Sequence, residues 1–381
     1  MLKPTLLIVL ILLFCIPVSN NISAQEEVQD IQKDSVDISA ESALLLDWES
    51  KRALYAKEPH KERPIASITK IMTAILAIEH GDLDEEVKTS PTAAHTGGSS
   101  IWLEENEIKT LDELLLGLIL RSGNDAAVAI AEHISGSVED FAKLMTKRAR
   151  ELGALNTSFK NPHGLHHPEH YSTAYDMALI AAHAMTLEEF QRIASTSSTI
   201  ISWPEHPWDR HLYNQNKLLR IYEGAEGVKT GWTTPAGRCF VGSASRGGQR
   251  LISVVLNAPE MWDDTTALLD YGFNNYASFE LIKAQQYLKS IPVTEGVTGK
   301  VEAYAAENFD FPLAKAEERK ISYYFNVEQP LEAPLYKGER IGELELYLNN
   351  ELIGFVNLVA GNDVEKLTWW RRLIQLWGRG S

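Results

Sequence analysis

The hydrophobic pattern of the chain changes at about residue 276 and predicts two folded regions of different kinds. In the first region, apolar residues recur every three or four positions, as they do in helices packed on a core. These helices are predicted over 68–79, 111–120, 126–134, 138–152, 173–185 and 263–271. Short strand-like runs are found at 43–47, 52–55, 226–231, 238–244 and 250–256. The order predicts an α+β domain over residues 38–275, in which helices pack on an antiparallel sheet.

The second region, residues 276–362, alternates apolar and polar residues over short segments separated by turns. Val301–Tyr304, Ile321–Phe325 and Ile341–Tyr347 are examples of such segments. Asn349-Asn350 favours a tight hairpin turn, because asparagine tolerates the positive φ angles that such turns need. This pattern predicts a small all-β domain with the form of a sandwich.

The N-terminus has the pattern of a secretory signal peptide. A lysine precedes an apolar run from Leu6 to Val18, and the small residue Ala24 follows. The run is shorter than the roughly 18–20 residues that a spanning helix needs. We therefore predict removal of residues 1–24, with an uncleaved anchor as the alternative. Residues 25–37 are acidic and without periodicity, which predicts a flexible leader.

The C-terminal residues 363–381 predict an amphipathic helix. Leucine, isoleucine and tryptophan recur every three or four positions from Val364 to Trp377, while lysine and arginine fall largely on the other side. Such a helix is typical of binding at a membrane surface. Packing of the helix onto the β domain is the alternative.

Composition narrows the class of protein further. Of 381 residues, 44% are hydrophobic and 23% are charged, which is ordinary for a globular protein. The net charge of −16 is of the wrong sign for nucleic acid, so this partner is excluded. Without the signal peptide the single cysteine is Cys239, so no internal disulfide can form. It lies in Arg238-Cys-Phe-Val241, which predicts a buried strand rather than a nucleophile.

The first candidate for chemistry is Ser67-Ile-Thr-Lys70, at the start of a predicted helix. On a helix, residues three apart share one face, so Lys70 could take the proton of the Ser67 hydroxyl. Burial and a second cation such as Lys229 would lower the pKa of Lys70 enough for a neutral amine. Taken alone, Ser67 could equally be an N-cap and Lys70 a surface residue.

Two further motifs follow in order. Ser122-Gly-Asn124 lies on a turn between two predicted helices. There Ser122 can pass a proton, and the Asn124 amide can both donate and accept hydrogen bonds. Taken alone, this motif could equally be an ordinary helix–helix connection. Lys229-Thr-Gly231 lies on a predicted edge strand, where Gly231 would let a substrate lie close to the backbone. Each motif recurs by chance in many proteins, but the three together indicate a serine-based acyl transfer site.

In this order and setting, the motifs resemble those of low-molecular-weight penicillin-binding proteins that act as serine D-alanyl-D-alanine carboxypeptidases. The likeness runs from the hairpin at Ala43 through 64–73, 121–126 and 161–165 to Lys229–Gly231, and on into the β domain and tail. It implies the penicillin-binding and serine β-lactamase-like transpeptidase fold. It also implies removal of the terminal D-alanine from peptidoglycan stem peptides.

The resemblance implies catalytic roles for Ser67, Lys70 and Ser122. Ser67 would be acylated by the penultimate D-alanine, Lys70 would be the general base, and Ser122 would relay protons. The oxyanion hole would be the backbone N–H groups of Ser67 and Trp232. Water would then hydrolyse the ester, so the resemblance implies no metal and no organic cofactor.

It also implies substrate contacts for Asn124, Lys229, Thr230, Gly231 and Trp232. Lys229 and Thr230 would hold the terminal carboxylate, and the bulky Trp232 replaces the histidine or threonine of many relatives. The implied partners are stem peptides ending in D-Ala-D-Ala, β-lactams as inhibitors, and a membrane surface. The implied location of the exported protein is the outer face of the cytoplasmic membrane, in the cell wall or periplasmic space.

Three alternatives stay open. A class A β-lactamase needs a Glu-x-x-x-Asn pattern after the second motif, and Glu151 to Asn156 misses it by one residue. A metal hydrolase is suggested by the histidines at 163, 166, 167 and 170, although a solvated loop at the cleft rim is the expected setting. A non-catalytic wall-binding protein would be expected to have lost a motif, whereas all three are intact.

Overall fold

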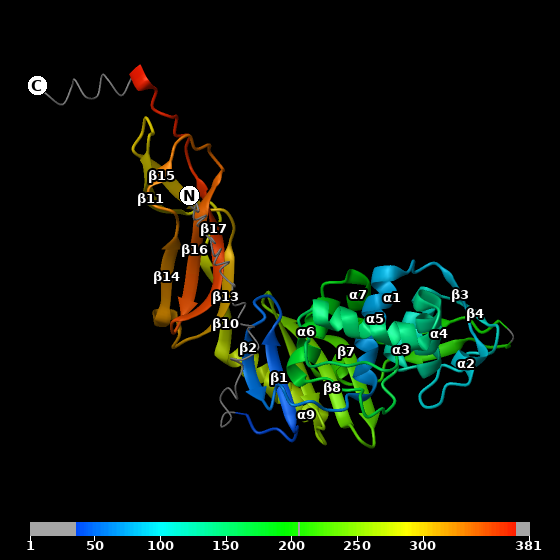
Figure 1. The fold of residues 1–381 in the computed structure, drawn as a ribbon. Coiled ribbons are helices and arrows are strands. Elements are labelled where there is room, and N and C mark those ends of the chain that lie inside the picture. The colour runs from blue at the N-terminus through cyan, green and yellow to red at the C-terminus, as the bar shows by residue number, and fades with distance from the viewer. Residues whose placement is uncertain (1–35, 205, 371–381) are drawn as a thin grey trace, which may run out of the picture.

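A computed structural model describes residues 36–204 and 206–370, which form two bodies (Figure 1). The larger body combines helices with a sheet, and the smaller one, from residue 276 onward, consists mainly of strands. The smaller body stands at the end of the larger one where β1 (Ser42–Asp47) and β2 (Ala53–Lys57) lie. The predicted signal peptide, and the predicted leader apart from its last two residues, lie outside the described residues.

The larger body is built on a five-stranded antiparallel sheet in the order β2-β1-β9-β8-β7. Its remaining strands are β7 (Ala225–Thr233), β8 (Gly237–Arg246) and β9 (Gln249–Leu256). The strand β1 is apolar from Ala43 to Leu46, as expected for a strand whose two faces are both buried. Leu44 and Leu46 belong to one core cluster and Leu45 to another. As predicted, β7 lies at an edge of the sheet.

Helices cover both faces of this sheet. The first face packs against α1 (Lys70–His80), α6 (Ala174–Ala184) and α7 (Glu188–Ser195). The helices α3 (Leu111–Leu120), α4 (Asn124–Ser135) and α5 (Val138–Glu151) pack on these helices and complete the same core. The second face packs against α9 (Met261–Asn275). The α+β class predicted from the sequence is therefore confirmed.

The helix ends follow local sequence signals. Thr110 caps α3 by accepting the backbone N–H of Glu113, and the Glu113 carboxylate accepts the backbone N–H of Thr110 in return. Thr173 caps α6 in a similar way through the backbone N–H of Asp176. The predicted start of the first helix at residue 68 was wrong. Ala66–Thr69 form a 3-10 turn (η1), and the α-helix α1 begins only at Lys70.

The sequence pattern missed several short elements. These are α2 (Pro91–Ala94), α8 (Leu218–Ile221), the hairpin of β3 (Glu86–Lys88) with β4 (Ile108–Thr110), the hairpin of β5 (Ser198–Ile201) with β6 (Arg210–Tyr213), and the helix α7. All of them are eight residues or shorter, so each contains too few positions to establish a period.

The smaller body is a β-sandwich. Its six-stranded sheet contains β14 (Ile321–Asn326), β16 (Arg340–Leu348), β17 (Glu351–Ala360), β12 (Lys300–Ala305), β11 (Tyr287–Thr294) and β15 (Leu331–Glu332) in this order. A second sheet pairs β10 (Tyr276–Ile282) with β13 (Phe309–Ala314) and packs on the first through a separate small core. Asn349 and Asn350 both have positive φ angles in the predicted β16–β17 turn.

The C-terminal segment differs from the prediction at its start. Val364 is buried and bridges to Leu335, and Lys366 bridges to Gly296, so this stretch is extended and packs on the β domain. Helical residues begin only at Trp369, and 371–381 lie outside the described residues. Within 36–204 and 206–370, no helix is long and apolar enough to cross a membrane.

Candidate active site

Ser67 lies on the turn η1, between the edge strand β7 and the loop 161–170. The residue before it, Ala66, is buried and has a φ of +48°, a conformation that costs energy for a side chain with a Cβ. The Thr69 hydroxyl donates to the Ala66 carbonyl at 2.7 Å, and it lies 2.8 Å from Nε2 of the buried His170. This chain of contacts holds the backbone that presents Ser67.

His170 acts in this chain as a neutral ring. The backbone N–H of Lys160 donates to its Nδ1 at 3.2 Å, so the proton is on Nε2 and is donated to Thr69. Burial lowers the pKa of His170 to about 3, and nearby positive charges act in the same direction. The ring therefore stays uncharged at neutral pH.

Lys70 is fully buried beneath Ser67. Its Nζ lies 3.0 Å from Ser67 Oγ, 2.7 Å from Asn124 Oδ1 and 2.8 Å from the His163 carbonyl oxygen. A neutral amine has two N–H donors and one lone pair. If the donors serve Asn124 and His163, the lone pair faces the Ser67 hydroxyl. Burial, and then the charge of Lys229, hold the pKa of Lys70 well below its usual value, which favours this neutral form.

Lys229 is the second buried cation of the site. Its Nζ donates to the Thr230 carbonyl at 3.0 Å, and burial lowers its pKa to about 7. At neutral pH a large share of Lys229 is thus protonated, and this charge opposes protonation of Lys70. The pair matches the electrostatic arrangement expected from the sequence.

Ser122 and Asn124 come from the turn between α3 and α4. Ser122 is buried with a φ of +62°, again a strained backbone for a residue other than glycine. The Asn124 side chain accepts from Lys70 and donates to the Gly97 carbonyl at 2.7 Å. The next residue, Asp125, is fully buried and accepts the backbone N–H groups of Ile101 and Leu103. The loop 97–103 is thereby tied to the second motif.

Gly231 brings β7 against the nucleophile. A Cβ on this residue would lie 2.8 Å from the backbone nitrogen of Ser67, so only glycine allows this approach. Its neighbour Thr230 lines the cleft in front of Ser67. The Trp232 side chain is 66% exposed and forms part of the cleft wall.

The predicted site residues thus come together. Ser67, Ser122, Thr230, Gly231 and Trp232 line one cleft, with Lys70 and Lys229 buried below. Five lining residues were missed from the sequence, namely Ser99, Gln215, Arg238, Met261 and Trp262. They come from separate segments and form no motif, so only the fold brings them together.

The histidine loop differs from the prediction of a solvated rim. His166 and His167 are exposed, but His170 is buried and His163 is half-buried. Burial, followed by the charge of Lys70, lowers the pKa of His163 to about 3. Among residues 36–204 and 206–370, no three His, Cys, Asp or Glu side chains are grouped to hold a metal.

Cys239 and Glu151 have no place at the cleft. Cys239 is buried in β8, and burial raises the pKa of its thiol to about 11, which confirms a structural role. Glu151 ends α5 and pairs with Lys147 and Arg148 at the surface. It lines no part of the cleft around Ser67, so it cannot serve as the deacylating glutamate of a class A β-lactamase.

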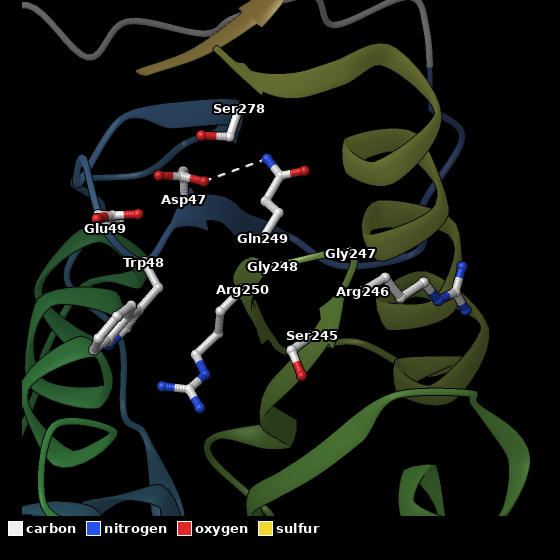
Figure 2. Close-up of a pocket in the computed structure, with 10 residues that line it drawn as sticks. All are labelled: Asp47, Trp48, Glu49, Ser245, Arg246, Gly247, Gly248, Gln249, Arg250 and Ser278. Atoms are coloured by element: carbon white, nitrogen blue, oxygen red, sulfur yellow. Dashed lines mark hydrogen bonds between the residues drawn. The ribbon is translucent and has the colours of Figure 1, made fainter. Parts of the chain in front are cut away.

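A separate hollow lies beside the turns that join β1 to β2 and β8 to β9 (Figure 2). The Asp47 carboxylate accepts from Gln249 there, and Ser278 of β10 also contributes to the wall. None of the predicted site residues lines this hollow. It lies where the two bodies meet and is distinct from the cleft around Ser67.

The cleft can therefore support nucleophilic acyl transfer by a serine that a buried lysine activates. Comparisons with known proteins agree with this class. A family model described as D-alanyl-D-alanine carboxypeptidase matches residues 27–260, which is more than half of the chain. A second model, the C-terminal domain of penicillin-binding protein 5, matches residues 276–366.

Individual relatives match over both bodies. The D-alanyl-D-alanine carboxypeptidase DacF of Bacillus subtilis is 36% identical over 89% of this chain and 90% of its own length. The D-alanyl-D-alanine carboxypeptidase DacA of Haemophilus influenzae is 32% identical over 86% of each chain. The crystal structure of penicillin-binding protein 5 from Haemophilus influenzae is also similar. It has a TM-score of 0.74 and 32% identity, and covers 87% of this chain and 98% of its own.

The chain belongs to the D-alanyl-D-alanine carboxypeptidase family of low-molecular-weight penicillin-binding proteins. The resemblance noted in the sequence, the penicillin-binding fold with its added β-sandwich, and the class of serine-type carboxypeptidase are all confirmed.

Proposed function

We propose that this protein removes the terminal D-alanine from peptidoglycan stem peptides through an ester on Ser67. The observation that carries the proposal is the setting of Lys70. Lys70 is fully buried, and two acceptors, Asn124 Oδ1 and the His163 carbonyl oxygen, are in place for two N–H groups of its amine. The lone pair of the neutral amine is then left for Ser67 Oγ, at 3.0 Å from Nζ. A general base for the serine hydroxyl needs this arrangement.

In the first half of the reaction, Ser67 Oγ attacks the carbonyl carbon of the penultimate D-alanine and its proton passes to Lys70. The oxyanion faces the backbone N–H groups of Ser67 and Trp232. The C–N bond then breaks, and the leaving amine takes a proton from Lys70 by way of the Ser122 hydroxyl. In the second half, water attacks the ester, Lys70 takes its proton, and Ser67 regains its hydroxyl.

The ammonium group of Lys229 and the hydroxyl group of Thr230, both on β7, could bind the free carboxylate at the end of the substrate. The Lys229 ammonium supplies positive charge below the cleft, and Thr230 lies in the cleft wall. Gly231 leaves room for an extended peptide along the edge strand. β-Lactams carry a carboxylate at a comparable position, so we expect them to acylate Ser67.

The proposal is tested by incubating the purified protein with a peptide ending in D-Ala-D-Ala and measuring released D-alanine. A matched peptide ending in D-Ala-L-Ala is the control. Release from the first peptide alone, together with covalent labelling by a fluorescent penicillin, would support the proposal. Labelling without release of D-alanine would indicate that another acceptor or another substrate is used.

We also propose that the protein works outside the cytoplasmic membrane and is held there by its C-terminal residues. The apolar run from Leu6 to Val18 and the Trp- and Arg-rich pattern of 369–379 support this location. A chain that is truncated after Leu367 should move from the membrane fraction to the soluble fraction and should release D-alanine at an unchanged rate. This truncation keeps Val364 and Lys366, which pack on the β domain. Membrane retention of the truncated chain would refute the proposal.

A further inference from the structure

Trp102 is displayed to solvent by a strained backbone. Its side chain is 60% exposed, and its φ angle of +59° lies in the left-handed region that large residues rarely adopt. A conformation of this kind persists only where surrounding contacts determine it, and such residues are concentrated at functional sites. An exposed indole adds little buried apolar area to the core, so core packing does not explain why the strained backbone is kept at Trp102.

Two buried charged residues hold this backbone in place. The Trp102 N–H donates to Ser100 Oγ at 2.7 Å, and that hydroxyl donates to the Asp125 carboxylate at 2.6 Å. On the other side, Arg210 donates to the Trp102 carbonyl at 2.6 Å. Arg210 is 4% exposed and is fixed in turn by a two-point ion pair with Glu107. The backbone that carries the indole is therefore held in place, so binding there needs little further ordering of the main chain.

The position of Trp102 relates it to the catalytic cleft. Ser99 lines the cleft, and three residues of extended chain span at most about 10 Å. Directly after Trp102, a groove is lined by Glu104, Glu105, Asn106 and the partly buried Trp203. Figure 1 shows β3 and β4, which flank this part of the chain, at the end of the larger body opposite the β domain.

The chemistry of this surface fits a sugar. An indole face can pack on the apolar face of a pyranose ring, while carboxylate and amide groups hydrogen-bond its hydroxyl and acetamido groups. An anionic lipid surface would be repelled by Glu104 and Glu105. In the proposed function, the stem peptide is joined to an amino sugar of the glycan strand. Its five residues span at most about 17 Å, so the sugar can reach beyond the cleft to Trp102.

We propose that Trp102 and the adjoining groove bind the amino-sugar residues of the glycan strand that carries the stem peptide. This inference rests on the proposed function, because it assigns a subsite to the same substrate. The enzyme would then favour D-alanine termini that are attached to glycan over free stem peptides.

The test compares Trp102→Ala with the unchanged protein on a disaccharide-pentapeptide and on the free pentapeptide. The unchanged protein should have the higher kcat/KM on the disaccharide substrate. In the variant, kcat/KM for this substrate should fall on the order of tenfold, as expected for loss of an aromatic contact and its buried area. The kcat/KM for the free pentapeptide and the rate of penicillin labelling should be unaffected. Trp102→Phe should retain most of the preference, and Tyr324→Ala, an equally exposed aromatic residue on β14, should retain all of it.

Equal losses on both substrates would overturn the sugar assignment and place Trp102 at the peptide instead. No loss on either substrate would also overturn it. A measurement without variants guards against a misfolded protein: a peptide-free oligosaccharide of N-acetylglucosamine should inhibit cleavage of the disaccharide substrate but not of the free pentapeptide. Failure of the unchanged protein to cleave both substrates would instead count against the proposed function.

Discussion

Replacing Lys70 with methionine is expected to slow the acylation of Ser67 by about a thousandfold, in the range found for loss of a general base. Methionine is unbranched and of similar length, so it fills the buried space without a nitrogen at 3.0 Å from Ser67 Oγ. The rate of covalent labelling by a fluorescent penicillin measures the effect. Labelling at more than a tenth of the normal rate would show that Lys70 is not the base.

The pH profile separates this chemical role from a structural one. As pH falls through the lowered pKa of Lys70, its amine gains a proton and kcat/KM should decline. As pH rises through about 7, Lys229 loses its charge and the hold on the substrate carboxylate should weaken. The profile should therefore be bell-shaped. In Lys70→Met the acidic limb of the residual activity should disappear.

A matched control for this variant is Lys109→Met. Lys109 is also fully buried, but it pairs with Glu107 and Glu113 and bonds Ser202, away from the cleft. Its replacement removes one cation from beside Glu107 and Glu113, leaving Glu107 paired with Arg210 alone, and should lower the melting temperature. The labelling rate of the folded protein should remain nearly unchanged. This result would show that loss of a buried lysine does not by itself slow the acylation of Ser67.

Gly164→Ala is expected to cause the largest loss of stability among the changes considered. Gly164 has a φ of +86°, and a Cβ there would lie 1.9 Å from the Ala66 carbonyl oxygen. The left-handed conformation and the forced displacement together cost about 3 kcal/mol or more. The melting temperature should fall by roughly 6–12 °C. Penicillin labelling should also drop, because the displaced Ala66 carries the turn of Ser67.

Gly153→Ala provides the comparison for this change. Gly153 has nearly the same φ, +85°, but the nearest atom to a Cβ there is Leu179 Cδ1 at 3.6 Å, an ordinary contact. Only the conformational term then remains, about 1–2 kcal/mol, and labelling should be normal. Similar stabilities for the two variants would mean that the approach of Gly164 to Ala66 is less tight than described.

The parts that the sequence predicted best are those with a local signal. The β1–β2 hairpin and the helices of ten residues or more were expected from period and turn residues, and the edge position of β7 was expected from the Lys229–Gly231 motif. The three motifs predicted Ser67, Lys70, Asn124 and Lys229 as site residues, and the fold brings these residues together. Their shared site could be anticipated only because the motifs resemble those of a known family, since the segments are far apart along the chain.

The parts that escaped prediction depend on contacts between distant segments. His170 looked like one of several loop histidines, yet its bond to Thr69 places it behind the nucleophile. Asp125 directly precedes the helix predicted over 126–134, and its partners at 100–103 appear only in the fold. Val364 matched the helical period of the tail, but pairing with Leu335 holds it in an extended segment.

The measurement that tests the central claim most directly is the mass of the protein after brief incubation with benzylpenicillin, followed by mapping of the modified peptide. The account predicts an increase equal to the mass of one intact penicillin, located on Ser67, and its loss in Ser67→Ala. An adduct that persists in Ser67→Ala, or that maps to another residue such as Ser122, would contradict the assignment of the nucleophile.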